Sequence, residues 1–253
     1  MGCGPEKEYP EATPPTSTCT SCDNADLGIP VLTDSGGYGA VTTYGSVTDP
    51  QPSAGGACNY GATQIMNFAA AFANLEPGDG KGMWNKGHAC GQCVRVRVGS
   101  DTGWRQVVVR IVDKCPDGYC GIDLGGAPAQ TLMGTQPGRY AGDWTLVGCD
   151  SALDVSDGAS SLFVKDGSNQ WWSLIQVRNP PSAVTAIHWR RLTDQAQGEL
   201  PWATEAENFF KIPDTLLANS DSLMLNIHYW TGTSDSICLP GTAFGTAEAQ
   251  WIL

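Results

Sequence analysis

The sequence is short of charged residues, and of positive charge above all. Charged residues make up 16% of the 253-residue chain, and 14 Lys and Arg stand against 26 Asp and Glu, for a formal net charge of −12 at pH 7. A nucleic-acid-binding surface needs clustered Lys and Arg, so this balance argues against a nucleic-acid partner. No apolar run approaches the roughly 18 residues of a membrane helix, so no transmembrane segment is predicted either.

Histidine is scarce too, and this helps to decide whether the ten cysteines bind a metal or form disulfides. His88, His188 and His228 have no ligand-like spacing, and the two CxxC pairs lie much further apart than the roughly 15–20 residues of a zinc ribbon. We therefore expect no metal and no cofactor, and cysteines paired as disulfides in an oxidising compartment. The chain starts MGC and continues directly into polar sequence, which favours the mature form of a secreted, extracellular protein.

Glycine and proline are abundant, at 31 and 16 residues, and they separate short apolar runs as in a β-rich protein. Val94–Val98 alternates apolar and charged residues like a half-buried strand, and Gln106–Val112 is apolar enough for a buried strand. One helix is predicted over residues 65–75, where apolar residues are spaced three, four and three apart: Ile65, Phe68, Phe72 and Leu75.

The chain divides into four parts. Residues 1–27 are a Pro-, Thr- and Cys-rich extension, residues 28–149 alternate strands with Gly-rich turns, and residues 150–158 are a short polar linker. Short strand candidates at regular spacing predict a β-sandwich over residues 159–253. These candidates are Ser161–Val164, Trp171–Val177, Ala183–Trp189, Asn208–Ile212 and Leu223–Trp230.

Two acids of the first domain could carry chemistry. Asp113 ends the strand Gln106–Val112, and Asp123 stands in the sequence GIDL. A carboxyl group at the end of a buried strand is open to desolvation, which would raise its pKa and suit a general acid in glycoside hydrolysis. The alternative is structural: each acid caps a turn, or pairs with Arg110 or Lys114.

The nine tryptophans suggest a carbohydrate surface on the second domain. Trp171 and Trp172 are adjacent, and neighbours on a regular strand point to opposite faces, so both are exposed only where the strand bends or bulges. An exposed indole ring binds the flat face of a sugar by burying apolar area. Trp189 and Trp230, on other strands, are expected in the core.

Six segments in this order resemble the expansin family, particularly its bacterial and other microbial members. They are GAVTTYG at 39–45, GGACNYG at 55–61, CGQC at 90–93, VDKCP at 112–116, IDL at 122–124 and WWSLIQVRN at 171–179. The agreement runs from about Tyr38 to at least Phe210. The resemblance implies an all-β protein: a six-stranded double-psi β-barrel, related to family 45 endoglucanases, followed by an immunoglobulin-like β-sandwich that binds carbohydrate.

The function that the resemblance implies is non-hydrolytic loosening of plant cell walls. Such a protein disrupts the contacts of cellulose with matrix glucans such as xyloglucan or mixed-linkage glucan, and we expect it to act as a monomer. A net charge of −12 should weaken its attraction to anionic pectin. Two other functions stay open, a weak endo-β-1,4-glucanase and a pure cellulose-binding module.

The resemblance also implies a polysaccharide groove on the barrel. Thr42 and Tyr44 match the family's Thr and aromatic residue, Asp113 matches an acid at a strand end, and Asp123 matches the general acid of the related endoglucanases. Bacterial members often have a Tyr two residues after the first of these acids, where this chain has a cysteine, so Tyr119 is the candidate to replace it.

On the second domain, the family has a planar aromatic strip. Trp171 and Trp172 match its first two members, and Lys165 matches a lysine beside it. Glu207 falls where the third aromatic residue is expected, so Trp202 is its candidate replacement.

The cysteine pairing of plant expansins would join Cys58 to Cys90, Cys93 to Cys149, and Cys115 to Cys120. Four cysteines then have no assigned partner: Cys3, Cys19, Cys22 and Cys238. A link from the extension to Cys238 would fasten the N-terminus to the second domain.

Hydrolysis needs a general base as well as a general acid. The hydrolases that resemble this fold take their base from the segment that reads VTTYG here, which contains no acid; Asp49 is the nearest one. Loss of general base catalysis costs about 10²–10⁴ in rate, so Asp123 alone should give little turnover. We therefore expect that the protein is not an enzyme.

Overall fold

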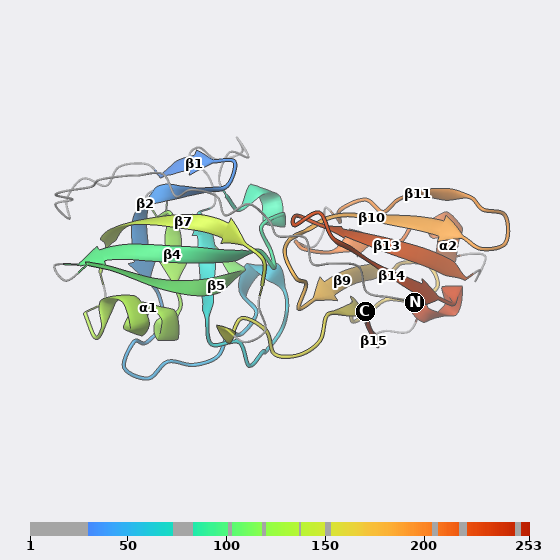
Figure 1. The fold of residues 1–253 in the computed structure, drawn as a ribbon. Helices are drawn as coiled ribbons and strands as arrows, with labels where there is room; N and C mark the ends of the chain where they lie inside the picture. The colour runs from blue at the N-terminus through green and yellow to red at the C-terminus, as the bar shows by residue number, and fades with distance from the viewer. Residues whose placement is uncertain are drawn as a thin grey trace, which may run out of the picture.

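The structure is a computed structural model that describes residues 30–72, 83–100, 103–117, 120–136, 138–149, 153–203, 207–217, 222–245 and 249–253. The predicted N-terminal extension, with Cys3, Cys19 and Cys22, lies outside these residues, as does Tyr119. The described residues form a barrel and a sandwich of two sheets that lie side by side (Figure 1). None of their helices is long and apolar enough to cross a membrane.

The first half of the chain forms a closed, mixed barrel of six strands. The strand order is β2-β6-β3-β5-β4-β7, and β7 pairs back onto β2, while β1 extends β2 as an edge strand. The pairs β2–β6 and β3–β5 are parallel, and the others are antiparallel. The predicted six-stranded barrel is confirmed. Together with the edge strand β1 (Val31–Thr33), the six barrel strands are β2 (Gly36–Thr43), β3 (Phe68–Phe72), β4 (Cys93–Ser100), β5 (Gly103–Cys115), β6 (Ile122–Leu124) and β7 (Tyr140–Val147).

The side chains at alternate positions of the strands point inward and fill the barrel. Val94, Val96 and Val98 point inward from β4, as their spacing in the sequence predicts. Trp144 on β7 is almost fully buried against Gly121, where a Cβ atom would lie 2.2 Å from the indole ring. Gly121 therefore leaves the space that this large core residue needs. The short helices of this half are η1 (Gly56–Cys58), η2 (Asn85–Gly87) and α1 (Gly126–Met133).

The helix predicted over residues 65–75 is wrong, because Phe68–Phe72 is strand β3. This strand pairs with β5 on one side and β6 on the other, so its backbone groups are satisfied by two neighbours rather than by a helical turn. Its sequence FAAAF reads as helical because alanine is a strong helix former. Here the small side chains serve close packing, since Ala69 and Ala71 fill the interior of the barrel.

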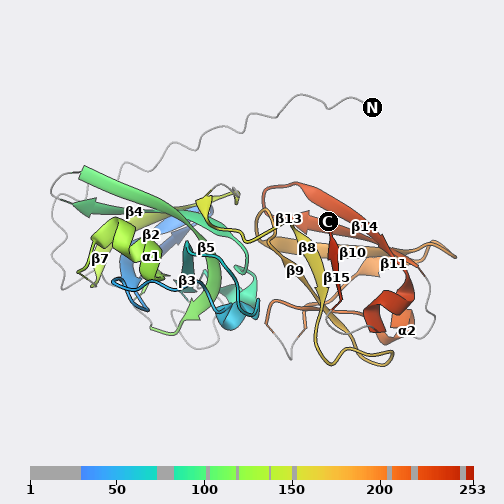
Figure 2. The same cartoon turned by 90° about the horizontal axis from the view of Figure 1, so that it is seen from below.

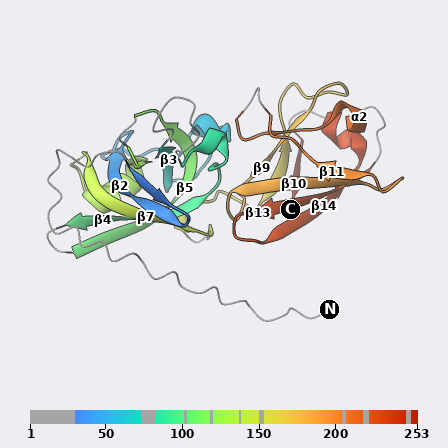
Figure 3. The same ribbon diagram turned by 90° about the horizontal axis from the view of Figure 1, so that it is seen from above.

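The second half forms a β-sandwich, as predicted. One sheet has the order β11-β10-β13-β14 and the other β12-β9-β8-β15, and both are antiparallel. Seen from below, β8, β9 and β15 lie nearest the viewer (Figure 2), whereas β10, β11, β13 and β14 do so from above (Figure 3). The strands are β8 (Ser161–Val164), β9 (Leu174–Arg178), β10 (Val184–Arg191), β11 (Gln197–Glu199), β12 (Phe210–Lys211), β13 (Leu223–Tyr229), β14 (Ser234–Leu239) and β15 (Gln250–Ile252).

One continuous core joins the two sheets of the sandwich. Ile175 and Val177 of β9 meet Ile187 of β10 and Ile227 of β13, and the short helices α2 (Asp214–Leu217) and η4 (Gly241–Gly245) close one end. Trp189 packs against this core, as predicted. Trp230 was expected there too, and that prediction is wrong: it follows the end of β13 and is 41% exposed.

Candidate functional site

Four residues stand in register across four neighbouring strands of the barrel. Thr42 of β2 pairs with Asp123 of β6, Asp123 with Ala70 of β3, and Ala70 with Asp113 of β5. Paired residues of a sheet point to the same face, so these four side chains form a row, here called the acidic row. Strand spacing places the Cα atoms of the two acids roughly 10 Å apart, with only a methyl group between them. The sequence analysis missed Ala70, whose role depends on the strand order.

The Asp123 carboxyl group is held by its neighbour in the row. The Thr42 hydroxyl donates a hydrogen bond to Oδ1 of Asp123 at 2.7 Å. Burial raises the pKa of Asp123 above its usual range, the charges of Asp117 and Asp113 raise it further, and the Thr42 hydrogen bond and Arg139 oppose the shift. A carboxyl group with a raised pKa retains its proton to higher pH, which suits a donor to a sugar oxygen.

This shift predicts that Asp123→Asn raises the melting temperature at pH 7 and leaves it unchanged at pH 3. The folded-state pKa lies above the unfolded value of about 3.9, so below that value the carboxyl group is protonated in both states. As the pH rises through the folded-state pKa, ionisation of the partly buried group destabilises the wild type alone. The amide oxygen of asparagine still accepts the Thr42 hydrogen bond.

Scanning calorimetry from pH 3 to pH 7 measures this difference. Asp49→Asn is the control, because Asp49 is exposed on the surface. Parallel pH curves for the wild type and Asp123→Asn would contradict the assignment.

Asp113 is fixed by backbone donors. The N–H groups of Ala57 and Lys114 both donate to its Oδ1 at 2.8 Å. The helix η1 reaches the carboxyl group only because residue 56 is glycine: its φ is +48°, and a Cβ atom there would lie 2.5 Å from Cγ of Asp113. The other oxygen, Oδ2, accepts no hydrogen bond that the described residues donate.

Tyr44 covers one side of the acidic row. Its ring packs against Ala70 and against the disulfide of Cys115 and Cys120, and it meets Phe68 edge-on with the ring centroids 5.8 Å apart. Burial raises the pKa of Tyr44 far above its usual value, and the two acids of the row add to the shift. Its hydroxyl group therefore stays protonated and is a permanent hydrogen-bond donor beside two carboxyl groups.

The acidic row offers hydrogen-bond acceptors and donors to sugar hydroxyls. Two other acids and the possibility of a metal site remain to be considered near it. Asp49, the acid nearest the VTTYG segment, is exposed and accepts a hydrogen bond from Gln51 at 3.1 Å. Asp117, near Tyr119 in sequence, forms an ion pair with Arg139 at 2.7 Å. The described residues contain no group of three His, Cys, Asp or Glu side chains that could hold a metal ion.

The two adjacent tryptophans of the sandwich lie in a tight turn before β9, and not on the strand itself. Asn169 and Trp172 exchange both backbone hydrogen bonds, and the Asn169 side chain accepts the N–H of Trp171 at 2.8 Å. Strand alternation therefore does not apply to this pair. Trp171 is 74% exposed and Trp172 is half-buried, so both present ring surface to solvent.

Lys165 lies close to this turn in the chain, and its Nζ is 5.5 Å from the centroid of the Phe209 ring. The ring of Phe209 is buried, so the lysine stem lies over apolar surface while its ammonium group stays at the surface. Trp171, Trp172 and Lys165 are called the tryptophan platform below.

Trp202 occupies a different place. It is half-buried between the ring of Phe210, at 4.3 Å, and the ring of His88 of the barrel, at 4.2 Å. Both neighbours lie within stacking distance, so Trp202 joins the barrel to the sandwich. Its role in sugar binding stays a prediction.

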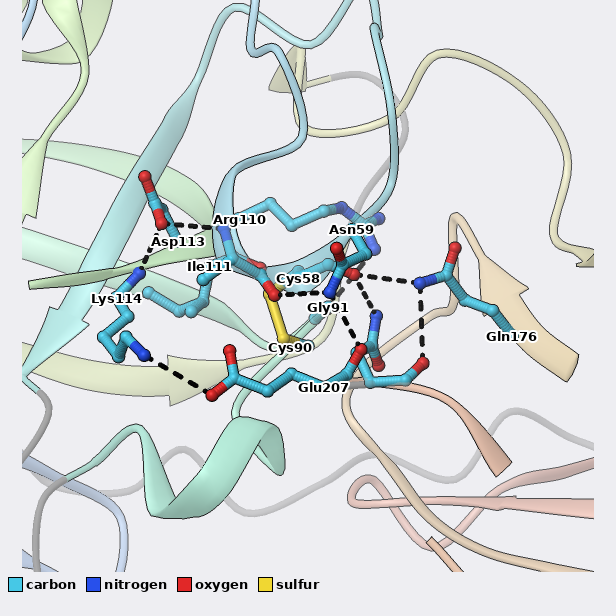
Figure 4. Close-up of a disulfide and its surroundings, with 12 residues drawn as sticks. Cys58, Asn59, Cys90, Gly91, Arg110, Ile111, Asp113, Lys114, Gln176 and Glu207 are labelled. Atoms are coloured by element: carbon cyan, nitrogen blue, oxygen red, sulfur yellow. Dashed lines mark hydrogen bonds and ion pairs between the residues drawn. A yellow bond between two sulfur atoms is a disulfide. The ribbon is translucent and has the colours of Figure 1, made fainter. Parts of the chain in front are cut away.

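Polar contacts across the domain junction connect the acidic row to the sandwich (Figure 4). Lys114, the neighbour of Asp113, pairs with Glu207 at 3.4 Å, and the Asn59 side chain donates to the Glu207 carbonyl at 3.1 Å. The carbonyl of Cys58 accepts from the buried side chains of Gln176 at 2.9 Å and Asn208 at 3.0 Å. These contacts link the two domains. Glu207, where an aromatic residue was expected, thus takes part in an ion pair.

Three disulfides brace the barrel, and they are the pairs that the resemblance implied: Cys58–Cys90, Cys93–Cys149 and Cys115–Cys120. Cys238 is exposed and forms no disulfide with any described cysteine. Its predicted link to the N-terminal extension involves residues outside the described part of the chain.

Comparisons with known proteins find a matching family model, similar sequences and similar folds. The family model of the Barwin family matches residues 70–149. The chain is 30% identical to Expansin-B16 of Oryza sativa subsp. japonica over 142 residues, or 52% of this chain and 50% of that protein. It is 31% identical to Expansin-like protein 1 of Dictyostelium discoideum over 153 residues, or 56% of this chain and 46% of that protein. The match thus spans about half the length of each relative.

The fold resembles solved expansin structures over most of the chain. The apo expansin of Clavibacter michiganensis superimposes with a TM-score of 0.58, at 19% identity, over 83% of this chain and 96% of that one. A variant of the same expansin in complex with cellohexaose gives a TM-score of 0.57 at 18% identity, with the same coverage. The chain is therefore similar to expansins in about half of its sequence and in its fold, and the Barwin family model matches residues 70–149.

Proposed function

We propose that this protein is a secreted, monomeric, non-hydrolytic cell-wall loosening protein that binds cellulose and matrix glucans. Residues 28–149 act as the barrel domain and residues 159–253 as the carbohydrate-binding domain. The observation that carries the proposal is the combination of the acidic row and the tryptophan platform on two domains that polar contacts link at the junction. The cellohexaose complex of a protein with a similar fold supports a glucan as the ligand.

In this proposal the platform holds the polymer and the acidic row grips one chain of it. Trp171 and Trp172 bind sugar faces, and Lys165 donates to hydroxyl groups at their edge. Thr42, Tyr44, Asp113 and Asp123 exchange hydrogen bonds with a single glucan chain, and Tyr119 and Trp202 are further candidates. Each new hydrogen bond replaces one between neighbouring glucan chains, so the binding free energy separates the chains without cleaving a bond.

The proposed absence of cleavage rests on the lack of an acid in the VTTYG segment, from which the related hydrolases take their base. An inverting mechanism needs a base roughly 6.5–9.5 Å from the acid, on the far side of the sugar. The Cα atoms of Asp113 and Asp123 lie roughly 10 Å apart by strand spacing, and both side chains are on the same face of the barrel. Its Oδ1 is occupied by two backbone donors.

A weak endo-β-1,4-glucanase is the second candidate, and one observation favours it: the raised pKa of Asp123 is that of a general acid. Asp49 would then be the candidate base. Separate Asp123→Asn and Asp49→Asn variants distinguish the two functions.

We expect Asp123→Asn to reduce the creep rate of heat-killed plant wall strips severalfold, because the uncharged amide accepts weaker hydrogen bonds than a carboxylate. Asp49→Asn should creep like the wild type. Unchanged creep in Asp123→Asn would remove the acidic row from the function. Sugar release that both variants lose would make the protein a glucanase.

A further inference from the structure

A cleft of about 340 Å³ opens where the barrel, the linker and the sandwich meet. Polar side chains from all three parts line it: Tyr60, Arg110, Asp157, Arg178, Asn179 and Gln250. Its volume is at the small end of the roughly 300–1,000 Å³ range of ligand pockets. It contains none of the residues of the acidic row or of the tryptophan platform, so it is a separate site.

Arg110, on β5, is a buried cation with one unused nitrogen. Its side chain is 1% exposed. Nε donates to the carbonyl of Val155, and Nη1 donates to those of Pro180, at 2.9 Å, and Gly91, at 3.3 Å. Nη2 has no hydrogen-bond partner in the described part of the chain. A buried N–H group without an acceptor costs free energy, so this nitrogen favours a ligand that accepts a hydrogen bond.

No carboxylate of the described residues forms an ion pair with Arg110, although the charge of Asp157 acts on it from further away. Burial lowers its pKa to about 10, so the guanidinium group is still charged at neutral pH. The side chain of Tyr60 is also buried in the cleft wall.

Arg178, at the end of β9, adds a second cation to the same cleft. Its guanidinium group lies flat over the Phe163 ring, 3.4 Å from the centroid, and Nε donates to Gln176 at 3.3 Å. Stacking fixes the plane of the guanidinium group before any ligand arrives. Asp157 is the one acid among the described residues of the lining, and its Oδ2 accepts the backbone N–H of Gln64 at 3.1 Å. The cleft therefore carries a net positive charge on a chain of net charge −12.

We propose that this cleft binds the carboxylate of a uronic acid. A planar carboxylate matches the planar donors of a guanidinium group, so the two arginines supply the charge recognition. Asn179 and Gln250 carry amides that both donate and accept, which suits the ring hydroxyls of a sugar. The negative charge of the whole protein disfavours a long polyanion. The cleft is thus suited to single uronate units on an otherwise neutral polysaccharide.

Titration calorimetry on the whole protein tests this proposal, which does not depend on cellulose binding. We expect sodium glucuronate to bind and glucose, which lacks the carboxylate, to bind at least tenfold more weakly. Arg178→Gln should weaken glucuronate binding at least tenfold. The matched control is Arg190→Gln, which changes the net charge equally on an exposed strand of the other sheet and should bind like the wild type.

Inorganic phosphate and oligogalacturonate complete the test. We expect phosphate to bind more weakly than glucuronate, and a long oligogalacturonate to bind more weakly per uronate unit at low salt. Phosphate binding as tight as that of glucuronate would make the cleft a general anion site and overturn the assignment. The proposal is also overturned if glucuronate does not bind, since water alone then satisfies Arg110, or if both arginine variants lose binding equally.

Discussion

Replacing Trp171 and Trp172 together by alanine should weaken binding to cellulose about 70-fold. Trp171 is 74% exposed and its neighbour Trp172 is half-buried. If a glucan covers roughly 100 Å² of the two rings, the lost burial is worth about 2.5 kcal/mol, and each 1.4 kcal/mol is a factor of ten in affinity. Depletion binding assays on microcrystalline cellulose measure the change.

Trp230→Ala is the matched control for this double variant. Trp230 is 41% exposed, belongs to the other sheet of the sandwich and lies outside the platform, so its loss should leave cellulose affinity within twofold of the wild type. Equal losses in both proteins would mean that exposed tryptophans bind cellulose without regard to position. Full affinity in the double variant would show that the platform does not bind the polymer.

Removing the Cys93–Cys149 disulfide should destabilise the barrel by about 4 kcal/mol, the largest expected effect on stability. The bridge closes a loop of 56 residues, and the chain entropy released in the unfolded state grows with loop length. The same relation gives about 2 kcal/mol for Cys115–Cys120, which closes only 5 residues. Denaturant unfolding of the two double alanine variants measures the difference.

The second pair is the control for the first, because both variants lose two cysteines and one bridge. A larger loss for the Cys115 and Cys120 variant would contradict the loop-length argument. It would indicate instead that the short bridge holds Tyr44 and Ala70 in place, since it packs against both residues.

Much of the fold could be predicted from alternation in the sequence. Val94–Val98 lies within β4, because side chains on the two faces of a strand meet different surroundings and this leaves a period of two, whereas Gln106–Val112, within β5, was predicted from its apolar run. Phe68–Phe72 misled the same reasoning, since a strand buried on both sides has no polar face to alternate with. Only its pairing with two neighbours distinguishes it from a helix.

The acidic row could be predicted in part. Thr42, Tyr44, Asp113 and Asp123 came from motif resemblance, and the structure brings Thr42 within hydrogen-bond distance of Asp123. The spacer Ala70 has no chemical signature of its own, because its role depends on strand register.

The contacts of the domain junction could not be predicted from the sequence for a similar reason. The ion pair of Lys114 and Glu207 joins residues 93 positions apart in the chain, and its partners depend on how the two domains dock. Trp202 shows the same limit, since the sequence marks it as an aromatic residue but not as the neighbour of His88.

The most direct test of the account is to measure wall-strip creep and reducing-sugar release in the same sample of the wild-type protein. Amorphous cellulose and mixed-linkage glucan serve as additional substrates for the sugar assay. The proposed function predicts creep of heat-killed wall strips with no sugar released above a heat-denatured control. Sugar release that rises in step with creep would contradict it, because bond cleavage would then loosen the wall.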